Sequence, residues 1–294
     1  MILVTGATGT VGRALLPQLL ERDEEVKVLV RDPRRLGRLR VEVRLTLGDL
    51  AELTDPRILR QALRGVKTVV HLAAAIRDQP PATVQEINGL ATARLLRAAE
   101  SAGVERFVFF SALNATQFQR TRFFRSKALA EEAVEKSPLD SVIFAPSIVY
   151  DRDDPWVTIQ RRFALLPAVP ISGSGDSAFQ PIWAHDVAAC TVEALARNGG
   201  PARYELAGPE TLTYDEIARL IARASGRERP LVHVPLSFVR AGLKSLHRVF
   251  RDASFATWEE AELMEIPMTT PRGTADAEAL GVTPKRMAEV LGAA

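Results

Sequence analysis

The stretch MILVTGATGTVGRALLPQLLER (residues 1–22) decides the fold of this chain. An apolar run joins a segment with helical spacing through a turn in which glycines follow the pattern G-x-x-G-x-x-G. The first glycine of such a turn permits a sharp bend, the second lets the backbone approach a pyrophosphate, and the third lets the helix pack close to the strand. Free N–H groups at the helix start attract the phosphates. The sequence therefore predicts a dinucleotide-binding loop formed by Thr5, Gly6, Thr8, Gly9, Thr10, Val11 and Gly12.

Strands and helices alternate from this loop to about residue 150. The predicted strands are apolar throughout and lie at 25–30, 41–47, 67–74, 104–112 and 140–146. The predicted helices between them have helical apolar spacing and lie at 55–65, 83–103 and 122–136. Strands that are apolar on both sides indicate a parallel sheet with helices on both faces, which is the doubly wound α/β, or Rossmann, architecture.

The alternation weakens after residue 150, which predicts a smaller C-terminal α/β lobe that is partly interleaved with the first domain. We expect the dinucleotide-binding domain to comprise 1–150 and about 182–200, and the substrate or partner lobe to comprise about 151–181 and 201–294. Further helices are predicted at 184–197, at 213–226 with Thr213 and Glu216 as a capping box, and at 283–292 with Thr283 as N-cap.

The composition indicates a globular protein of the cell interior. Hydrophobic residues make up 47% and charged residues 25% of the 294 residues, and the net charge of +2 is too small to indicate nucleic-acid binding. The single cysteine, Cys190, excludes an intrachain disulfide, and the chain has neither a charged leader nor an apolar run of about 18 residues. We therefore expect a cytoplasmic protein with no nucleic-acid partner. The four histidines lack metal-ligand spacing, which predicts no metal site.

The segment PLSFVRAGLKSLHRVFR (235–251) has an apolar stripe flanked by basic residues. A helix of this kind either packs its stripe into the C-terminal lobe or lies on an anionic membrane or a protein partner. Both alternatives stay open from the sequence, so a location peripheral to the inner face of a membrane is retained beside the cytoplasmic one.

The residues after the second predicted strand bear on which dinucleotide is expected. An NAD site usually has an acid at the end of this strand, on the ribose hydroxyls. Here Arg31 takes that place and Arg35 follows. A guanidinium fork suits a 2′-phosphate, so NADP(H) is favoured over NAD(H). Asp32, one position after the expected acid, is a sign in favour of NAD(H).

Five segments together carry a family resemblance: TGATGTVG (5–12), GDL (48–50), HLAA (71–74), INGLATARLLRAAESAGVERFVFFSA (87–112) and QPIWAHDVA (180–188). With them the chain resembles the extended and atypical short-chain dehydrogenase/reductase superfamily over nearly its whole length. Within that superfamily it looks like the NAD(P)-binding, NmrA-like branch. It is more closely similar to bacterial relatives of the nucleotide-binding accessory subunit of respiratory complex I.

The resemblance implies the neighbours of the cofactor. It places Ser111 beside the reacting carbon and makes Asn88 a structural polar residue of its helix. The further residues that it places along the cofactor are Asp49 and Leu50 at the adenine, Ala73 and Ala74 after the fourth strand, and Pro146, Ser147 and Ile148 near the nicotinamide.

Catalytic members of the superfamily use the motif Tyr-x-x-x-Lys, in which the lysine holds the nicotinamide ribose and the tyrosine transfers a proton. Lys127 matches the lysine, but Phe123 stands at the tyrosine position. No tyrosine of this chain lies four residues before any lysine, so the motif is absent and not displaced. Tyr150 is interpreted as a packing residue, with a replacement acid as the alternative, and His71 as a near-core histidine.

Two hypotheses follow for the function. The favoured one is an NADP(H)-binding protein that lacks the catalytic tyrosine and acts as a redox-sensing or accessory protein through a partner. The alternative is an NADP(H)-dependent oxidoreductase that works without the tyrosine, with Lys127 and Ser111 near the nicotinamide and a small molecule as substrate.

Overall fold

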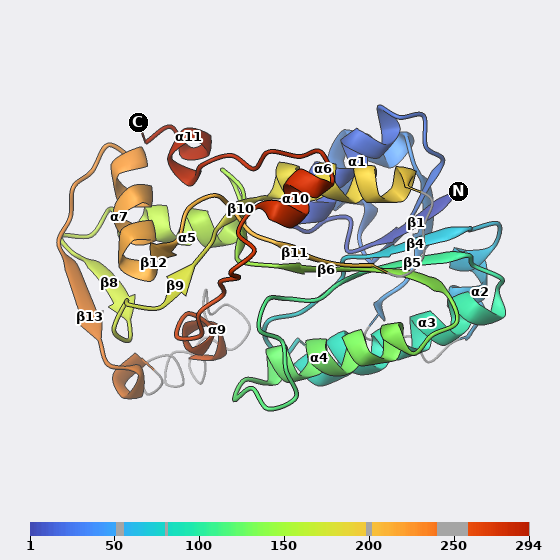
Figure 1. Cartoon of the computed structure of the whole chain (residues 1–294), viewed down its shortest axis with the longest axis horizontal. Coiled ribbons are helices and arrows are strands. Elements are labelled where there is room, and N and C mark those ends of the chain that lie inside the picture. The colour runs from blue at the N-terminus through green and yellow to red at the C-terminus, as the bar shows by residue number, and fades with distance from the viewer. Residues whose placement is uncertain (51–55, 80–81, 198–201, 240–257, 294) are drawn as a thin grey trace.

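A seven-stranded parallel sheet forms the centre of the computed structural model, which describes residues 1–50, 56–79, 82–197, 202–239 and 258–293 (Figure 1). The order across the sheet is β11-β6-β5-β4-β1-β2-β3. The strands are β1 (Ile2–Thr5), β2 (Val26–Val30), β3 (Arg44–Leu47), β4 (Thr68–His71), β5 (Arg106–Phe110), β6 (Asp140–Pro146) and β11 (Ala202–Leu206). Every neighbouring pair is parallel. The strand order reverses between β1 and β4: β2 and β3 follow on one side of β1, and β4, β5, β6 and β11 follow on the other. This is the predicted Rossmann arrangement.

Helices cover both faces of the sheet because its strands are apolar on both sides; β2, for example, is buried at all five positions. On one face lie α1 (Thr10–Leu20) and α6 (Ala184–Ala196) (Figure 1). The other face is covered by α2 (Pro56–Leu63), α3 (Ala91–Ser101) and α4 (Arg122–Glu135). Separate apolar cores form on the two faces.

Two predicted elements begin differently in the structure. The strand predicted at 41–47 starts only at Arg44, because a 3-10 helix occupies Pro33–Val41. The helix predicted at 83–103 opens with one π-helical segment, Glu86–Leu90, before the regular α3. The wider turn lies where the buried Asn88 side chain bonds to the backbone of another segment.

The C-terminal lobe has its own apolar core around α5 (Pro155–Phe163) and α7 (Tyr214–Ala224). The predicted capping box is confirmed, because Thr213 and Glu216 bond reciprocally at the start of α7. The remaining elements are β7 (Val149–Tyr150), β8 (Val169–Ser172), β9 (Ala178–Phe179), β10 (Ile182–Trp183), β12 (Leu212–Thr213), β13 (Leu231–Val234), α9 (Trp258–Leu263), α10 (Ala275–Ala279) and α11 (Met287–Leu291).

The start of the last helix was predicted wrongly. Thr283 is not its N-cap, because α11 begins at Met287 after Arg286. The segment before it is extended and fixed by distant carboxylates: the Lys285 backbone N–H donates to Asp186 at 2.9 Å. The Met287 N–H donates to Glu210 at 3.1 Å. These contacts hold the backbone where a helical turn was expected.

The chain also returns to the main sheet later than expected. Strand β11 lies within the range assigned to the second lobe, yet it pairs with β6 in the main sheet. The division at about residue 200 therefore leaves one strand of the main sheet in the lobe's range.

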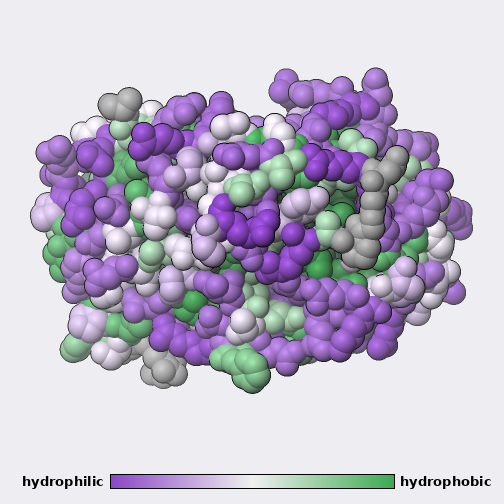
Figure 2. All heavy atoms as spheres, viewed as in Figure 1, coloured by the Kyte–Doolittle hydropathy of each residue, from purple (hydrophilic) through white to green (hydrophobic). Residues whose placement is uncertain are grey.

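The surface is mixed in character, and hydrophilic residues dominate the face seen in Figure 2. None of the helices in the described ranges is long and apolar enough to span a bilayer. The basic amphipathic segment predicted at 235–251 lies outside the described residues from 240 onward; 236–239 are helical.

Candidate nucleotide-binding site

The glycine turn after β1 is packed so closely that two of its glycines have no room for a side chain. Gly6 has a positive φ of 75°, and a Cβ there would lie 2.5 Å from the Ala73 backbone nitrogen. A Cβ on Gly12 would lie 2.5 Å from the Gly6 carbonyl oxygen. The turn is therefore held between α1 and the segment that follows β4; the glycine spacing predicted the close packing of the helix but not the contact with the β4 segment.

The start of α1 is open to an anion. Gly9 is the N-cap, so no side chain caps the helix, and its first turn contains no acidic residue. The Gly9 N–H donates to the Gly6 carbonyl at 2.9 Å, and Arg13 donates from Nε to the Thr8 carbonyl at 3.1 Å. These bonds fix the loop, while the N–H groups of Thr10 and its successors have no capping side chain. Such a helix start fits a pyrophosphate.

The end of β2 presents an arginine and not a carboxylate. The Arg31 side chain is 53% exposed, and its Nη1 lies 3.5 Å from Asp49. Asp32 is used locally, because its carboxylate accepts from the Arg34 backbone N–H at 3.0 Å and caps the 3-10 helix. Arg35 is exposed in the same helix.

A neutral histidine lies beneath the loop. Thr92 donates its hydroxyl proton to the Asn88 carbonyl, so it can only accept from Nε2 of His71. His71 Nδ1 then accepts from the Thr5 hydroxyl at 2.7 Å. Complete burial, with a smaller contribution from the charge of Lys127, lowers the pKa of His71 to about 3. His71 is thus a satisfied core histidine, as interpreted from the sequence.

Asn88 clamps the segment that follows β4. Its side chain is fully buried, accepts from the Ala75 N–H and donates to the Ala75 carbonyl, both at 2.8 Å. It also donates to Ser126 of α4 at 3.3 Å. This one amide therefore fixes the loop that carries Ala73 and Ala74, next to the glycine turn, and ties that loop to α4.

Lys127 is buried on the sheet side of α4, with 2% exposure. Its ammonium donates to the Phe110 carbonyl at 2.6 Å and lies 4.9 Å from the centre of the Phe109 ring. Burial lowers the pKa of Lys127 to about 7, and Glu131 opposes that shift. Phe123, one helical turn earlier, is half-buried with its ring edge-on to Phe124.

Ser111 does not present its proton to the space beyond the strand ends. The residue is 5% exposed, and its hydroxyl donates to the carboxylate of Glu131. The same carboxylate accepts from Nε of Arg203 at 2.7 Å. Sequence reasoning missed Glu131, although its position four residues after Lys127 puts both on one face of α4.

Ser147, another expected site residue, is engaged elsewhere, and the hydroxyl of Tyr150 is buried without a hydrogen bond among the described residues. The buried Ser147 hydroxyl donates to the Met268 carbonyl at 2.6 Å and accepts from the Gln180 N–H at 3.1 Å. It joins β6 to the C-terminal segment, with Pro146 and Ile148 on either side. The Tyr150 hydroxyl is fully buried and has no hydrogen-bond partner among the described residues. Burial raises the pKa of Tyr150, so its hydroxyl keeps its proton.

Strands β1, β2, β4 and β5 are neighbours in the sheet. Their carboxyl ends bring together the glycine turn, the Arg31 end of β2, the Ala73 loop and Lys127. In an open parallel sheet this edge, at the point where strand order reverses, is where ligands bind. The close backbone packing at Gly6 and Gly12 and the uncapped start of α1 fit a dinucleotide.

Comparison with known proteins agrees with this geometry. A family model described as NAD(P)H-binding matches residues 6–198. NADH dehydrogenase (ubiquinone) 1 alpha subcomplex subunit 9, mitochondrial, from Arabidopsis thaliana is 30% identical over 236 residues, which cover 74% of this chain and 56% of that protein. The chain thus matches little more than half the length of this relative.

Two further known proteins are similar to this chain, one in sequence and one in fold. NAD(P)H azoreductase from Xenophilus azovorans is 29% identical and is matched over 82% of this chain and 79% of its own length. The crystal structure of Thermus thermophilus UDP-glucose 4-epimerase in complex with NAD superposes with a TM-score of 0.74 at 21% identity, covering 99% of this chain and 96% of that one. At this identity the likeness concerns the fold alone.

Proposed function

This chain belongs to the NAD(P)H-binding family, and from that premise we propose that it binds NADP(H) as a redox-sensing or accessory protein that acts through a partner. The glycine turn and the open start of α1 would hold the pyrophosphate. When bound, the cofactor supplies a nicotinamide that can carry a hydride.

Support for NADP(H) over NAD(H) comes from the end of β2. Arg31 stands where a ribose-binding acid is expected, and Asp32 is committed to the backbone of the 3-10 helix. A 2′-phosphate would add two negative charges beside Arg31 and Arg35. Asp49 already neutralises Arg31 in part, and the phosphate would compete with it for that guanidinium.

Support for an accessory role comes chiefly from helix α4. Phe123, which has no proton to transfer, takes the position of the expected tyrosine, and the Ser111 hydroxyl is directed to Glu131. Neither group offers a proton donor to a substrate carbonyl. The Arabidopsis relative is named as a subunit of a larger assembly, which agrees with a protein partner for this chain.

A second candidate function is an NADP(H)-dependent reductase that dispenses with the tyrosine. Lys127 has a pKa of about 7, so at neutral pH its amine can both hold and release a proton. The relative named as an NAD(P)H azoreductase supports this candidate. In such a reaction Lys127 or water would supply the proton that accompanies the hydride.

One purification separates the two candidates. The nucleotide that copurifies is identified by mass spectrometry, and NADPH oxidation is then followed against carbonyl, quinone and azo compounds. Retained NADP(H) with no turnover is expected. Turnover that disappears in Lys127→Ala while nucleotide binding persists would refute the accessory function and support the reductase. Purified protein that binds neither NADP(H) nor NAD(H) would refute both.

A further inference from the structure

Glu131 occupies a place that nothing in the site so far explains. Its carboxylate is carried on the sheet side of α4, only 9% exposed, one helical turn beyond Lys127. Two groups fix it there: the hydroxyl of Ser111, which directly follows β5, and the guanidinium of Arg203 from β11. A carboxylate buried to this extent requires such partners, since an unpaired buried charge is costly.

We propose that Glu131 is a positioning residue of the nucleotide site: it keeps the buried Lys127 ammonium charged and directed at the Phe110 carbonyl, ready to hold the nicotinamide ribose. The inference rests on the proposed nucleotide-binding function and adds to it a residue that controls binding without touching the ligand.

The charged groups around Lys127 determine whether a substitution raises or lowers the pKa of Lys127. On α4, Glu131 is the acidic group whose charge raises the pKa of Lys127 against burial. From β4, His71 is neutral and adds no charge. From β5 come the Phe110 carbonyl and the Phe109 ring, which carry no charge, and Ser111 follows the strand.

Arg203 from β11 offsets part of the Glu131 charge. It is shared, because Nε donates to Glu131 and Nη1 donates to Glu205 at 2.8 Å. Removal of the Glu131 charge therefore leaves the buried Lys127 ammonium without the carboxylate that opposes the effect of burial on its pKa. Removal of Arg203 leaves the Glu131 carboxylate with the Ser111 hydroxyl and without a paired cation, so more of its charge acts on Lys127. The two changes must move the proton affinity of Lys127 in opposite directions.

The test is the pH dependence of NADP⁺ binding by calorimetry between about pH 5 and 9. In the natural protein the affinity falls about tenfold as Lys127 loses its proton near neutral pH. Glu131→Gln shifts the midpoint down by about one to two pH units, and Arg203→Gln shifts it up by about half a unit. Lys127→Met removes the step. Each titration is repeated with NAD⁺, which lacks the 2′-phosphate that itself titrates near pH 6.

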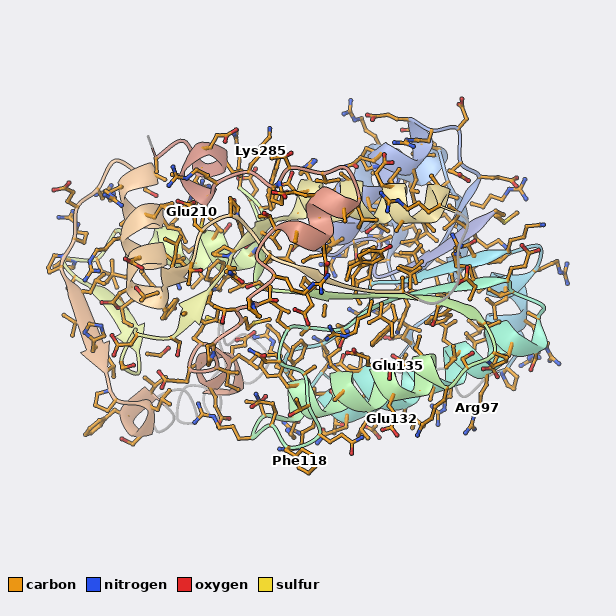
Figure 3. All side chains as sticks on the ribbon, in the orientation of Figure 1. Arg97, Phe118, Glu132, Glu135, Glu210 and Lys285 are labelled. Atoms are coloured by element: carbon orange, nitrogen blue, oxygen red, sulfur yellow. The ribbon has the colours of Figure 1, made fainter. Side chains whose placement is uncertain are left out.

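Glu132→Gln is the matched control, because Glu132 is the next residue along α4 but lies on its outer side (Figure 3), bonded to Gln117 and Lys136. Its midpoint stays that of the natural protein. A Glu131→Gln protein that folds and binds with an unshifted midpoint would overturn the proposal and leave the nucleotide function standing. So would shifts of the same sign in Glu131→Gln and Arg203→Gln. If Glu131→Gln does not fold, the upward shift in Arg203→Gln decides. Absence of NADP⁺ and NAD⁺ binding in the natural protein would instead refute the function on which the proposal rests.

Discussion

Replacing Gly6 by alanine tests whether the close approach at the glycine turn, and not only its backbone conformation, defines the site. Gly103 provides a matched control. Both residues have nearly the same positive φ, 75° at Gly6 and 73° at Gly103. A Cβ on Gly6 would lie 2.5 Å from the Ala73 nitrogen and 2.7 Å from the Leu72 carbonyl carbon, whereas a Cβ on Gly103 would meet nothing within 4 Å.

The expected magnitudes follow from that difference. An alanine in the left-handed region costs about 1 to 2 kcal/mol, and this cost applies to both variants. At Gly6 the new methyl also overlaps backbone atoms, which no rotamer change can relieve. Overpacking of this kind adds about 1 to 3 kcal/mol. Gly6→Ala is therefore expected to lower the free energy of unfolding by about 1 to 3 kcal/mol more than Gly103→Ala.

Urea unfolding at pH 7 measures the two free energies, and calorimetry with NADP⁺ measures binding in the same preparations. Gly103 follows α3, before the amino end of β5, so Gly103→Ala should bind like the natural protein. Gly6→Ala should bind at least tenfold more weakly, because the loop must move away from Ala73. Equal destabilisation of the two variants, with binding kept in both, would refute the role assigned to this contact.

Three further outcomes are expected. Arg31→Asp should lower the ratio of NADP⁺ to NAD⁺ affinity by about tenfold or more, because a charge-assisted bond to the 2′-phosphate is lost; Arg40→Asp is the control, and an unchanged ratio for Arg31→Asp would contradict the assignment. His71 has a pKa of about 3 when folded and about 6.5 when unfolded, so only the unfolded chain gains this proton as the pH falls between those values. The free energy of unfolding should thus fall by roughly 1.4 kcal/mol per pH unit in that window. Urea unfolding at pH 6.5 and 5 measures this pH dependence, and in His71→Gln the His71 contribution should be missing. If the variant and the natural protein lose equal stability between these pH values, the buried neutral state of His71 does not contribute to the pH dependence. Asn88→Leu leaves the Ala75 N–H and carbonyl without their partner, and should cost about 2 to 4 kcal/mol and weaken NADP⁺ binding; normal binding would contradict the clamp.

The glycine turn and the alternation of elements could be predicted because both are local signals. Gly6 and Gly12 are spaced as a strand–turn–helix unit requires, and the apolar runs mark strands buried on both faces. The clamp by Asn88 was foreseen only as a structural role implied by resemblance, because the sequence does not show which backbone its amide meets.

Long-range contacts account for what the sequence missed. Glu131 is held by Arg203, 72 positions away, and the start of α11 is set by Asp186, 99 positions from Lys285. Contacts between residues so far apart in the sequence produce no periodic pattern from which they could be predicted. The same limit applies to Ser111, whose proton goes to Glu131 and not toward the strand ends. The direction of a hydroxyl depends on what packs opposite it.

The position of β11 has a consequence for how the chain is made. A ribosome releases β6 long before β11, because the segment 147–201 comes between them. During that interval the seven residues of β6, Asp140–Pro146, have a partner only in β5 and leave their other edge free. An apolar edge of this length is a site for pairing with another chain. The nascent protein therefore carries an aggregation hazard while the lobe residues are being synthesised, and a version truncated before β11 would keep that hazard permanently.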